Sequence, residues 1–331
     1  MHWYNNQRHR SLELLIVVGS VRQVSQCDND ITTERAPHTG EWARRCNPNR
    51  LGFMSTGSVT SLASDRVGKT REYMQELWRR REFAIALGLG NLKARNASTS
   101  LGLFWWVLNP LLLGGVYFLV FGIFFGDRRP EGFLTYLLSG MFAFHFTGQA
   151  MTGGANSIIQ NARLLANLRF PRLILPISTL IEATVGFAFS LGVFVFIAAF
   201  SGQANFTGQI ALIPLILPVH LLFNLGLSAI TARLAVPFRD INNLLPYLNR
   251  VWLYMTPIIW PLSFLSNVSD GLESLIRFNP MFSFVGLYRG ALLGDPIPAD
   301  YVYGAVIWAV VVGVVGIAVF VKYEGRMVRY L

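Results

Sequence analysis

Apolar positions dominate the chain after a polar N-terminal part, and they gather into long stretches rather than into the short alternating patterns of a soluble domain. A helix needs about 20 apolar residues to cross roughly 30 Å of hydrocarbon. Six stretches satisfy this requirement and predict membrane-spanning helices: residues 101–126, 133–153, 173–201, 209–232, 243–265 and 301–321. The pattern therefore predicts an all-α integral membrane fold in which both ends of the chain lie on one side.

The distribution of Lys and Arg between alternate connections predicts the orientation. One side carries the basic N-terminal part together with Arg163, Arg169, Arg172, Arg233, Arg239, Lys322, Arg326 and Arg329. Cytoplasmic loops carry an excess of Lys and Arg, so this side is predicted to be cytoplasmic, with both termini on it. Arg128 and Arg129 on the opposite side weaken the bias without reversing it.

The connection from 266 to 300 contains an apolar run, Met281 to Leu293, that is interrupted by Arg289 and is too short to cross. A run of that length is typical of a re-entrant or interfacial segment. A lid on the outer surface is the alternative, and the sequence does not choose between them.

The N-terminal part divides into two regions. Residues 1–65 are rich in Asn, Ser, Thr, Arg and Gly, and we expect them to be disordered or to be mis-assigned coding sequence, with Met54 as the alternative start. Residues 66–98 are expected to form an amphipathic interface helix, best defined from Lys69 to Leu89.

One face of this interface helix is apolar, with Tyr73, Met74, Leu77, Trp78, Ala84 and Ile85. Its other face or boundary carries Arg71, Arg79, Arg80 and Arg81. That pattern suits a helix lying on the anionic cytoplasmic leaflet, and an ordinary solvated helix is the alternative.

Composition excludes several classes of protein. Hydrophobic residues make up 53% of the chain and charged residues only 14%, far from the roughly one quarter of a soluble domain. The net charge is +10, but the basic residues form no dense run interleaved with aromatics. Nucleic acid is therefore not an expected partner. Cys27 and Cys46 cannot build a disulfide framework, and no metal site is expected.

Residues 63–70 nearly match a phosphate-binding loop, but they follow Ser/Thr/Gly-rich coil rather than a strand. We therefore do not expect ATP to bind there.

Two charged residues fall inside predicted spans, Glu182 in the third and Arg250 in the fifth. Charges within a bilayer usually pair, face the protein interior or line a wet path. A Glu182–Arg250 pair is one hypothesis, and the alternative is that each side chain reaches an interface. His145 and His220 are solitary and are expected to be satisfied interior histidines.

Several blocks occur in the order found in a known family. They are 100–102 (Ser-Leu-Gly) with 105–110, 167–176 (NLRFPRLILP), 238–241 (Phe-Arg-Asp-Ile), 256–258 (Thr-Pro-Ile), and 279–281 (Asn-Pro-Met) followed by Arg289. From about residue 70 to the end, the chain resembles the ABC-2 type permeases, in particular the Wzm-like subunits that export lipid-linked O-antigen, teichoic acid or galactan. Asn96 departs from the Arg-Tyr pair that the family often has at 95–96.

The resemblance implies a permease half that acts as a homodimer with two copies of a Wzt-like cytoplasmic ATPase. ATP and Mg²⁺ would be bound by the ATPase, and no cofactor by this chain. The substrate would be a polyprenyl-diphosphate-linked polysaccharide, with galactan favoured because the chain looks most like actinobacterial members. An ABC-2 drug or small-lipid efflux permease is the alternative, and a membrane-embedded glycan-synthesis enzyme or scaffold is an alternative of another class.

A permease without its own nucleotide site must receive work through a rigid cytoplasmic element. Residues 155–172 are the candidate coupling helix, ended by Pro171 because the residue before proline leaves helical geometry. The candidate coupling residues are Asn161, Arg163, Asn167, Arg169, Phe170, Pro171 and Arg172, and the family motif at the end of the fourth span is Phe238, Arg239 and Asp240. Arg169 and Arg172 could instead only set topology, and Arg239 and Asp240 could form a local ion pair.

Aromatic side chains suit the passage of a glycan, since their apolar faces stack on the C–H faces of sugars and fix few hydrogen bonds. Phe142 and Phe146 in the second span, and Tyr254 and Trp260 in the fifth, are the candidate channel-lining residues. Packing or lipid-facing roles are the alternative for each.

Overall fold

The computed structural model describes residues 66–97, 104–125, 132–168, 170–200, 208–260 and 270–327, and no strand occurs in these ranges. The chain divides into two units, residues 1–69 and residues 70–331. The predictions for residues 1–65, including the Met54 start, lie outside the described residues. The all-α prediction is confirmed for the part of the chain that the structure describes.

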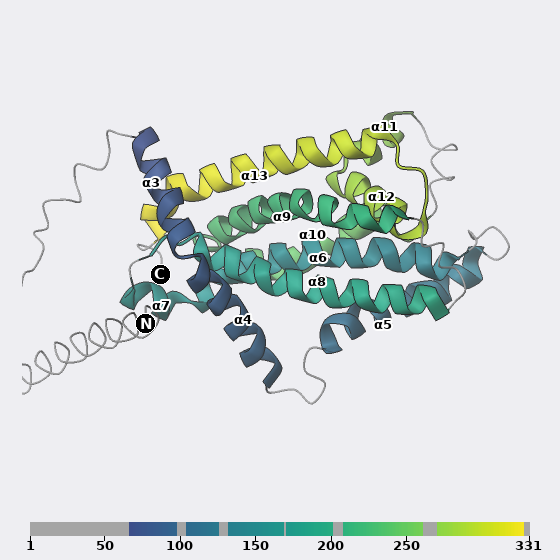
Figure 1. Cartoon of the computed structure of the whole chain (residues 1–331), viewed down its shortest axis with the longest axis horizontal. Helices are drawn as coiled ribbons and strands as arrows, with labels where there is room; N and C mark the ends of the chain where they lie inside the picture. The colour runs from purple at the N-terminus through teal and green to yellow at the C-terminus, as the bar shows by residue number, and fades with distance from the viewer. Residues whose placement is uncertain are drawn as a thin grey trace, which may run out of the picture. The chain divides into compact units, whose positions relative to one another are not determined.

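The described elements are helices that follow one another along the chain (Figure 1). They are α3 (Arg66–Arg79), α4 (Arg81–Ala97), α5 (Trp105–Phe125), α6 (Phe133–Gln160), α7 (Ala162–Asn167), α8 (Ile174–Phe200), the 3-10 turn η6 (Gly208–Leu212), α9 (Ile213–Ala235), α10 (Ile241–Met255), α11 (Asp270–Phe278), α12 (Pro280–Leu293) and α13 (Ala299–Met327).

Among the described residues, three helical segments are long and apolar enough to cross a membrane. They are Ile174–Phe200, Gly208–Ala235 and Ala299–Gly325, and they match the predicted third, fourth and sixth spans within a few residues. Leu111–Ile123 in α5 is a shorter apolar helix. That α5, α6 and α10 cross the membrane therefore stays a prediction.

Helix α6 lies at the centre of the bundle, in contact with α5, α8, α9, α10 and α12. Its surroundings are protein rather than lipid, so its sequence can carry small and polar residues that lower its hydropathy. Their polar groups bond within the helix: Thr152 donates to the carbonyl of Gly148 at 2.8 Å, and Ser157 donates to the carbonyl of Gly154 at 2.6 Å. Thr147 on α6 also meets His220 on α9 at 2.7 Å, which ties the two helices together.

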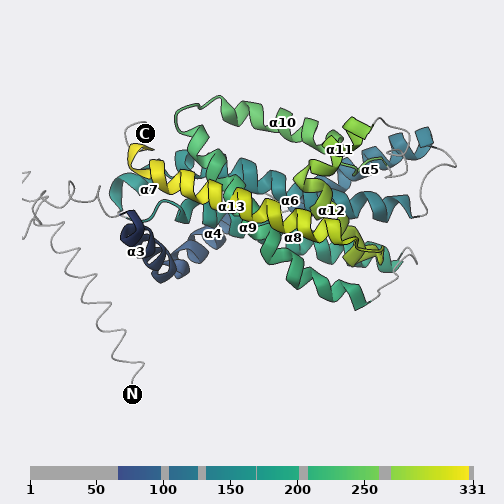
Figure 2. The ribbon, with the colours of Figure 1, turned by 90° about the horizontal axis from the view of Figure 1, so that it is seen from above.

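Helices α9 and α13 pack against each other through glycine. A side chain at Gly226 would overlap the carbonyl of Val312, and one at Gly316 would overlap the carbonyl of Gly226. Small residues let two backbones approach within a membrane, where close van der Waals contact is a main source of helix association. The two helices therefore pack closely against each other along the bundle (Figure 2).

The predicted fifth span differs most from the structure. Helix α10 ends at Met255 instead of continuing toward 265, because Pro257 forces Thr256 into an extended conformation with φ −99° and ψ 136°. Its 15 residues rise about 22 Å, short of the hydrocarbon thickness. Residues 261–265 of the predicted span lie outside the described residues.

The connection before the last helix forms two helices of different character. Helix α12 is buried among α6, α9 and α13, so it does not lie on the surface as the lid alternative required. Asn279 begins it, accepting a hydrogen bond from the backbone N–H of Met281 at 3.1 Å and one from the Trp252 indole at 2.7 Å. Asn279 also donates to the Thr256 hydroxyl at 2.9 Å, so the Asn-Pro block joins α10 to α12.

The expected interface helix consists of α3 and α4, separated by a turn at Arg80. Backbone hydrogen bonds of 3.1 Å from Arg80 to Glu76 and from Ala84 to Arg80 carry the helical pattern across the turn. Tyr73, Leu77 and Ala84 face inward as predicted, but Met74, Trp78 and Ile85 are exposed beside them. The inward face of α4 packs on α8, where a side chain at Gly88 would stand 2.7 Å from the Ser178 carbonyl.

Candidate functional site

The candidate coupling segment is built from two helices and an extended stretch rather than from the single helix predicted over 155–172. Helix α6 ends at Gln160, and Asn161 caps it by donating to the carbonyl of Ser157 at 2.8 Å. Helix α7 follows, and Leu168 is already extended, with φ −124° and ψ 138°. The chain thus leaves helical geometry earlier than Pro171 alone would require.

The tip of this segment is accessible to a partner. Arg163, Asn167 and Leu168 are exposed. Arg169 lies outside the described residues. The tip therefore combines polar and apolar groups of the kind that a protein surface can bind.

The base of the segment is anchored by the Phe-Pro-Arg motif. The Phe170 ring meets the Phe83 ring of α4 edge to face, with 5.4 Å between centroids. Pro171 is buried, and the side chain of Arg172 donates to the backbone carbonyl of Glu324 on α13. The motif thus fixes the segment to two different helices.

Glu324 is the acceptor around which this anchor is organised. Its carboxylate accepts the backbone N–H of Arg172 at 2.8 Å and the hydroxyl of Tyr73. The Tyr73 oxygen in turn accepts the backbone N–H of Leu173 at 3.3 Å. Burial, and then the negative charge of Glu324, raise the pKa of the Tyr73 phenol well above its usual value, so the phenol keeps the proton that it donates. We call Tyr73, Phe170, Arg172 and Glu324 the anchor cluster.

A buried apolar group lies next to the anchor cluster. Leu173, Val236 and Phe320 belong to one buried group that joins the coupling segment, the end of α9 and the end of α13. The ends that the orientation rule assigns to the cytoplasmic side therefore meet at one end of the bundle. Arg172 and Tyr73 stand out in the sequence, whereas Glu324 and Phe83 do not, because their partners are distant in the sequence.

The motif Phe238-Arg239-Asp240 lies at the same end, in the turn between α9 and α10. All three residues are exposed, and the backbone N–H groups of Ile241 and Asn243 bond to the carbonyls of Phe238 and Asp240. Asp240 precedes the first turn of α10, where a negative charge interacts favourably with the helix dipole. This turn is a second accessible surface at the end of the bundle that also carries the coupling segment.

One of the predicted interface arginines lies over an exposed tryptophan. Trp78 is 69% exposed, and the guanidinium of Arg81 lies 5.0 Å from the centroid of its ring. Arg80 forms an ion pair with Glu76 at 2.9 Å, and Arg79 ends α3 with an exposed side chain. An aromatic ring among cations is typical of residues at headgroup level.

The candidate channel residues occupy two environments. Phe142 and Phe146 are buried in the main core, where Phe146 stacks on Phe187 with 4.7 Å between centroids, which favours the packing alternative. Tyr254 is 48% exposed, and its hydroxyl lies 3.3 Å from the hydroxyl of Tyr117 on α5. Trp260 is partly buried and donates to the carbonyl of Tyr254 at 3.0 Å.

Tyr254 belongs to a row of polar and aromatic side chains along α10. Asn243, Tyr247, Arg250 and Tyr254 are spaced by four, three and four residues, so they share one helix face, and all four are exposed. We call this row the α10 stripe. Glu182 lies elsewhere, buried on α8 with 4% exposure, while Arg250 faces outward, so their pairing stays a prediction.

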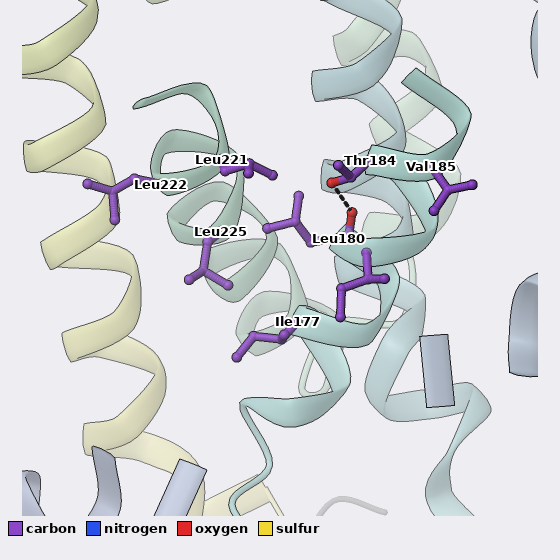
Figure 3. Close-up of a pocket in the computed structure, with 8 residues that line it drawn as sticks. Ile177, Leu180, Thr184, Val185, Leu221, Leu222 and Leu225 are labelled. Atoms are coloured by element: carbon purple, nitrogen blue, oxygen red, sulfur yellow. Dashed lines mark hydrogen bonds between the residues drawn. The ribbon is translucent and has the colours of Figure 1, made fainter. Parts of the chain in front are cut away.

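An aliphatic groove between α8 and α9 has a different chemistry (Figure 3). It has a volume of 370 Å³ and is lined by side chains such as Ile177, Leu180, Val185 and Leu221. The hydroxyl of Thr184 already donates to the carbonyl of Leu180 at 2.7 Å. The Thr184 proton is therefore already engaged, and the other side chains that line the groove are aliphatic.

Long apolar helices, an exposed polar row on α10 and an anchored connection at one end suit a membrane transport protein. No protein-family model matches the chain. Curated relatives do: it is 30% identical to the O-antigen export system permease protein RfbA of Myxococcus xanthus, over 68% of this chain and 85% of that protein. Two RfbA permeases of Klebsiella pneumoniae are 25% and 24% identical, each over 73% of this chain and 92% of theirs. The chain belongs to this family of O-antigen export permeases, the Wzm-like ABC-2 permeases.

Proposed function

We propose that this protein is the permease half of an ABC exporter that moves a polyprenyl-diphosphate-linked polysaccharide from the cytoplasmic to the outer side of the plasma membrane. The observation that carries the proposal is the match to an O-antigen export permease over 85% of that protein's length. Galactan is the favoured glycan, on the resemblance to actinobacterial members. Both termini are cytoplasmic in this proposal, and six helices cross the membrane.

The α10 stripe supports a polymer as the substrate. A charged group facing lipid is costly, so an exposed row containing Arg250 suits a wet surface better than acyl chains. The tyrosine rings add apolar faces that can stack on sugars while forming few hydrogen bonds, so a polymer could slide past them. In a homodimer, two such stripes would line a path along the interface, and the hydroxyl pair of Tyr117 and Tyr254 would hold α5 beside it.

The coupling tip and the turn at Phe238 support a separate ATPase as the source of work. Both surfaces are exposed at the end of the bundle that the orientation rule assigns to the cytoplasm. Two Wzt-like ATPase subunits would bind there and supply ATP and Mg²⁺, and this chain would hold no cofactor of its own. Movement of the tip would reach α13 through Arg172 and Glu324, and α4 through Phe170 and Phe83.

Depletion of the protein in its host tests the proposal. The lipid-linked glycan pool is fractionated by side of the membrane, and we expect long polymer to accumulate on the cytoplasmic side. An unchanged pool would refute the proposal in favour of drug or small-lipid efflux. Loss of polymer synthesis would refute it in favour of a glycan-synthesis enzyme or scaffold.

Complementation with variants tests the path. Arg250→Gln removes the charge from the α10 stripe, and we expect it to slow export while the protein still inserts. Arg277→Gln is the matched control, because Arg277 is also exposed but lies on α11, where it pairs with Glu273 at 2.8 Å. Equal export by the two variants would refute the role of the stripe.

A further inference from the structure

A second, more enclosed pocket lies where the start of α6, the turn after α10, α12 and the start of α13 meet. Its volume is 240 Å³, and its lining includes Tyr136, Pro257, Phe282, Arg289, Asp295 and Tyr301. Tyr136 is near the first residue of α6, at the opposite end of that helix from the coupling segment. The pocket is therefore separate from the anchor cluster, and Pro257 in its lining follows Tyr254 of the α10 stripe by three residues.

Arg289 supplies the most unusual group in this pocket. Its side chain is 4% exposed, and one terminal nitrogen donates to the carbonyl of Ile258 at 3.2 Å. The guanidinium carbon lies 3.5 Å from the centroid of the Tyr136 ring. Nε has no hydrogen-bond partner among the described residues, although a guanidinium has five N–H donors. Nε itself is fully covered, so a ligand could reach only the outer nitrogens of the guanidinium. Those nitrogens carry more N–H donors than the carbonyl of Ile258 and Tyr136 use, so Arg289 can also donate to a ligand in the pocket that it lines.

Asp295 determines which kind of ligand suits that donor. It is exposed and lines the same pocket, so a carboxylate and a guanidinium face one small space. An anion would gain from Arg289 and be repelled by Asp295. A neutral polyol matches both, because each hydroxyl can accept from a guanidinium and donate to a carboxylate.

The walls and the size of the pocket point to a ring with an apolar face. Tyr301 and Phe282 meet edge to face with 5.3 Å between centroids, and Pro257 adds a flat aliphatic surface. The volume is below the roughly 300–1,000 Å³ of sites for drug-sized ligands, so one ring fits better than a longer segment. The absence of a side chain at Gly286 lets the Tyr301 ring pack directly on α12, since a Cβ there would stand 2.6 Å from the ring.

We propose that this pocket binds a single neutral sugar ring, with Arg289 and Asp295 bonding its hydroxyls and the Tyr301 ring packing on its C–H face. The inference rests on the proposed function and deepens it, because it places a sugar subsite at the end of the bundle away from the coupling segment. A glycan leaving the membrane would meet this subsite one residue at a time.

The binding experiment uses the full-length protein in lipid nanodiscs, without ATPase, and methyl β-galactoside as the probe. Saturation-transfer NMR detects weak binding and reports which sugar protons contact the protein. We expect transfer to ring C–H protons in the wild type, and affinity about tenfold lower in Tyr301→Ala, equivalent to roughly 1.4 kcal/mol. Asp295→Asn is a second variant at an exposed position that leaves the core unchanged, and it should weaken binding as well.

Tyr303→Ala is the matched control, because Tyr303 stands two residues further along α13 and is 67% exposed. It should bind the probe as the wild type does. Absence of transfer in the wild type, equal transfer in the Tyr301 and Tyr303 variants, or displacement of the sugar by inorganic phosphate would each overturn the assignment.

The two proposals fail separately. If the probe binds but depletion leaves the glycan pool unchanged, the sugar subsite stands and the export function is overturned. If depletion causes lipid-linked polymer to accumulate but no sugar binds, export stands and the subsite is overturned.

Discussion

Removing the carboxylate of Glu324 should loosen the coupling segment from the rest of the permease. In Glu324→Ala, the backbone N–H of Arg172 and the hydroxyl of Tyr73 lose their acceptor, while the bond from the Arg172 side chain to the residue 324 carbonyl remains. A hydrogen bond to a charged group contributes about 1.5–3 kcal/mol. The anchor is partly buried, so we expect the two losses together to lower the free energy of unfolding by about 2–3 kcal/mol.

The assay is chemical unfolding of the purified protein in detergent, followed by measurement of ATPase activity in the complex with and without lipid-linked glycan. We expect Glu324→Ala to keep basal hydrolysis but lose most of its stimulation by substrate. Glu273→Ala is the control, because its pair with Arg277 is an exposed helical i,i+4 pair worth about 0.2–0.5 kcal/mol. If the two variants lose equal stability and keep equal stimulation, the anchoring role of Glu324 is wrong.

Further predictions concern packing inside the bundle. Gly226→Val should prevent accumulation of folded protein, because the new side chain overlaps the Val312 carbonyl, whereas Gly192→Val has open space and should be tolerated; membrane expression and monodispersity compare them. Asn279→Ala should cost about 2 kcal/mol through loss of a helix cap and of the Trp252 bond, and an unchanged unfolding midpoint would count against the joint between α10 and α12. His220→Ala should cost about 2–4 kcal/mol, because the buried ring stacks on Phe284 with 4.4 Å between centroids; His220→Phe, which keeps the stacking, should recover part of the thermal stability, and equal loss by both would contradict this reason.

The long apolar helices could be located from the sequence because hydropathy is a local property. The predicted third and sixth spans, 173–201 and 301–321, agree closely with Ile174–Phe200 and Ala299–Gly325. The end of α10 was missed although Thr256-Pro257 was visible, because the apolar run continues through the proline and hides the stop signal. Local composition thus gave the position of a helix better than its end.

The sites depend on contacts that local patterns do not contain. Arg172 and Glu324 are 152 residues apart, so only the folded chain shows that they meet. The spacing of Phe142 and Phe146 correctly places them on one face of α6, but the spacing does not say whether that face meets a channel or the core. Arg289 was visible as part of a motif, yet its burial against Tyr136 follows from the insertion of α12 into the bundle.

The central position of α6 has a consequence for the biogenesis of the protein. A helix enters the bilayer readily when its own residues are apolar, but α6 is rich in glycine, serine and threonine because protein surrounds it in the finished fold. Contacts with α5, α8 and α9 therefore position α6 in the fold. We therefore expect α6 to settle in the bilayer only with these neighbours, so the protein is assembled as a cooperative group of helices rather than one crossing at a time.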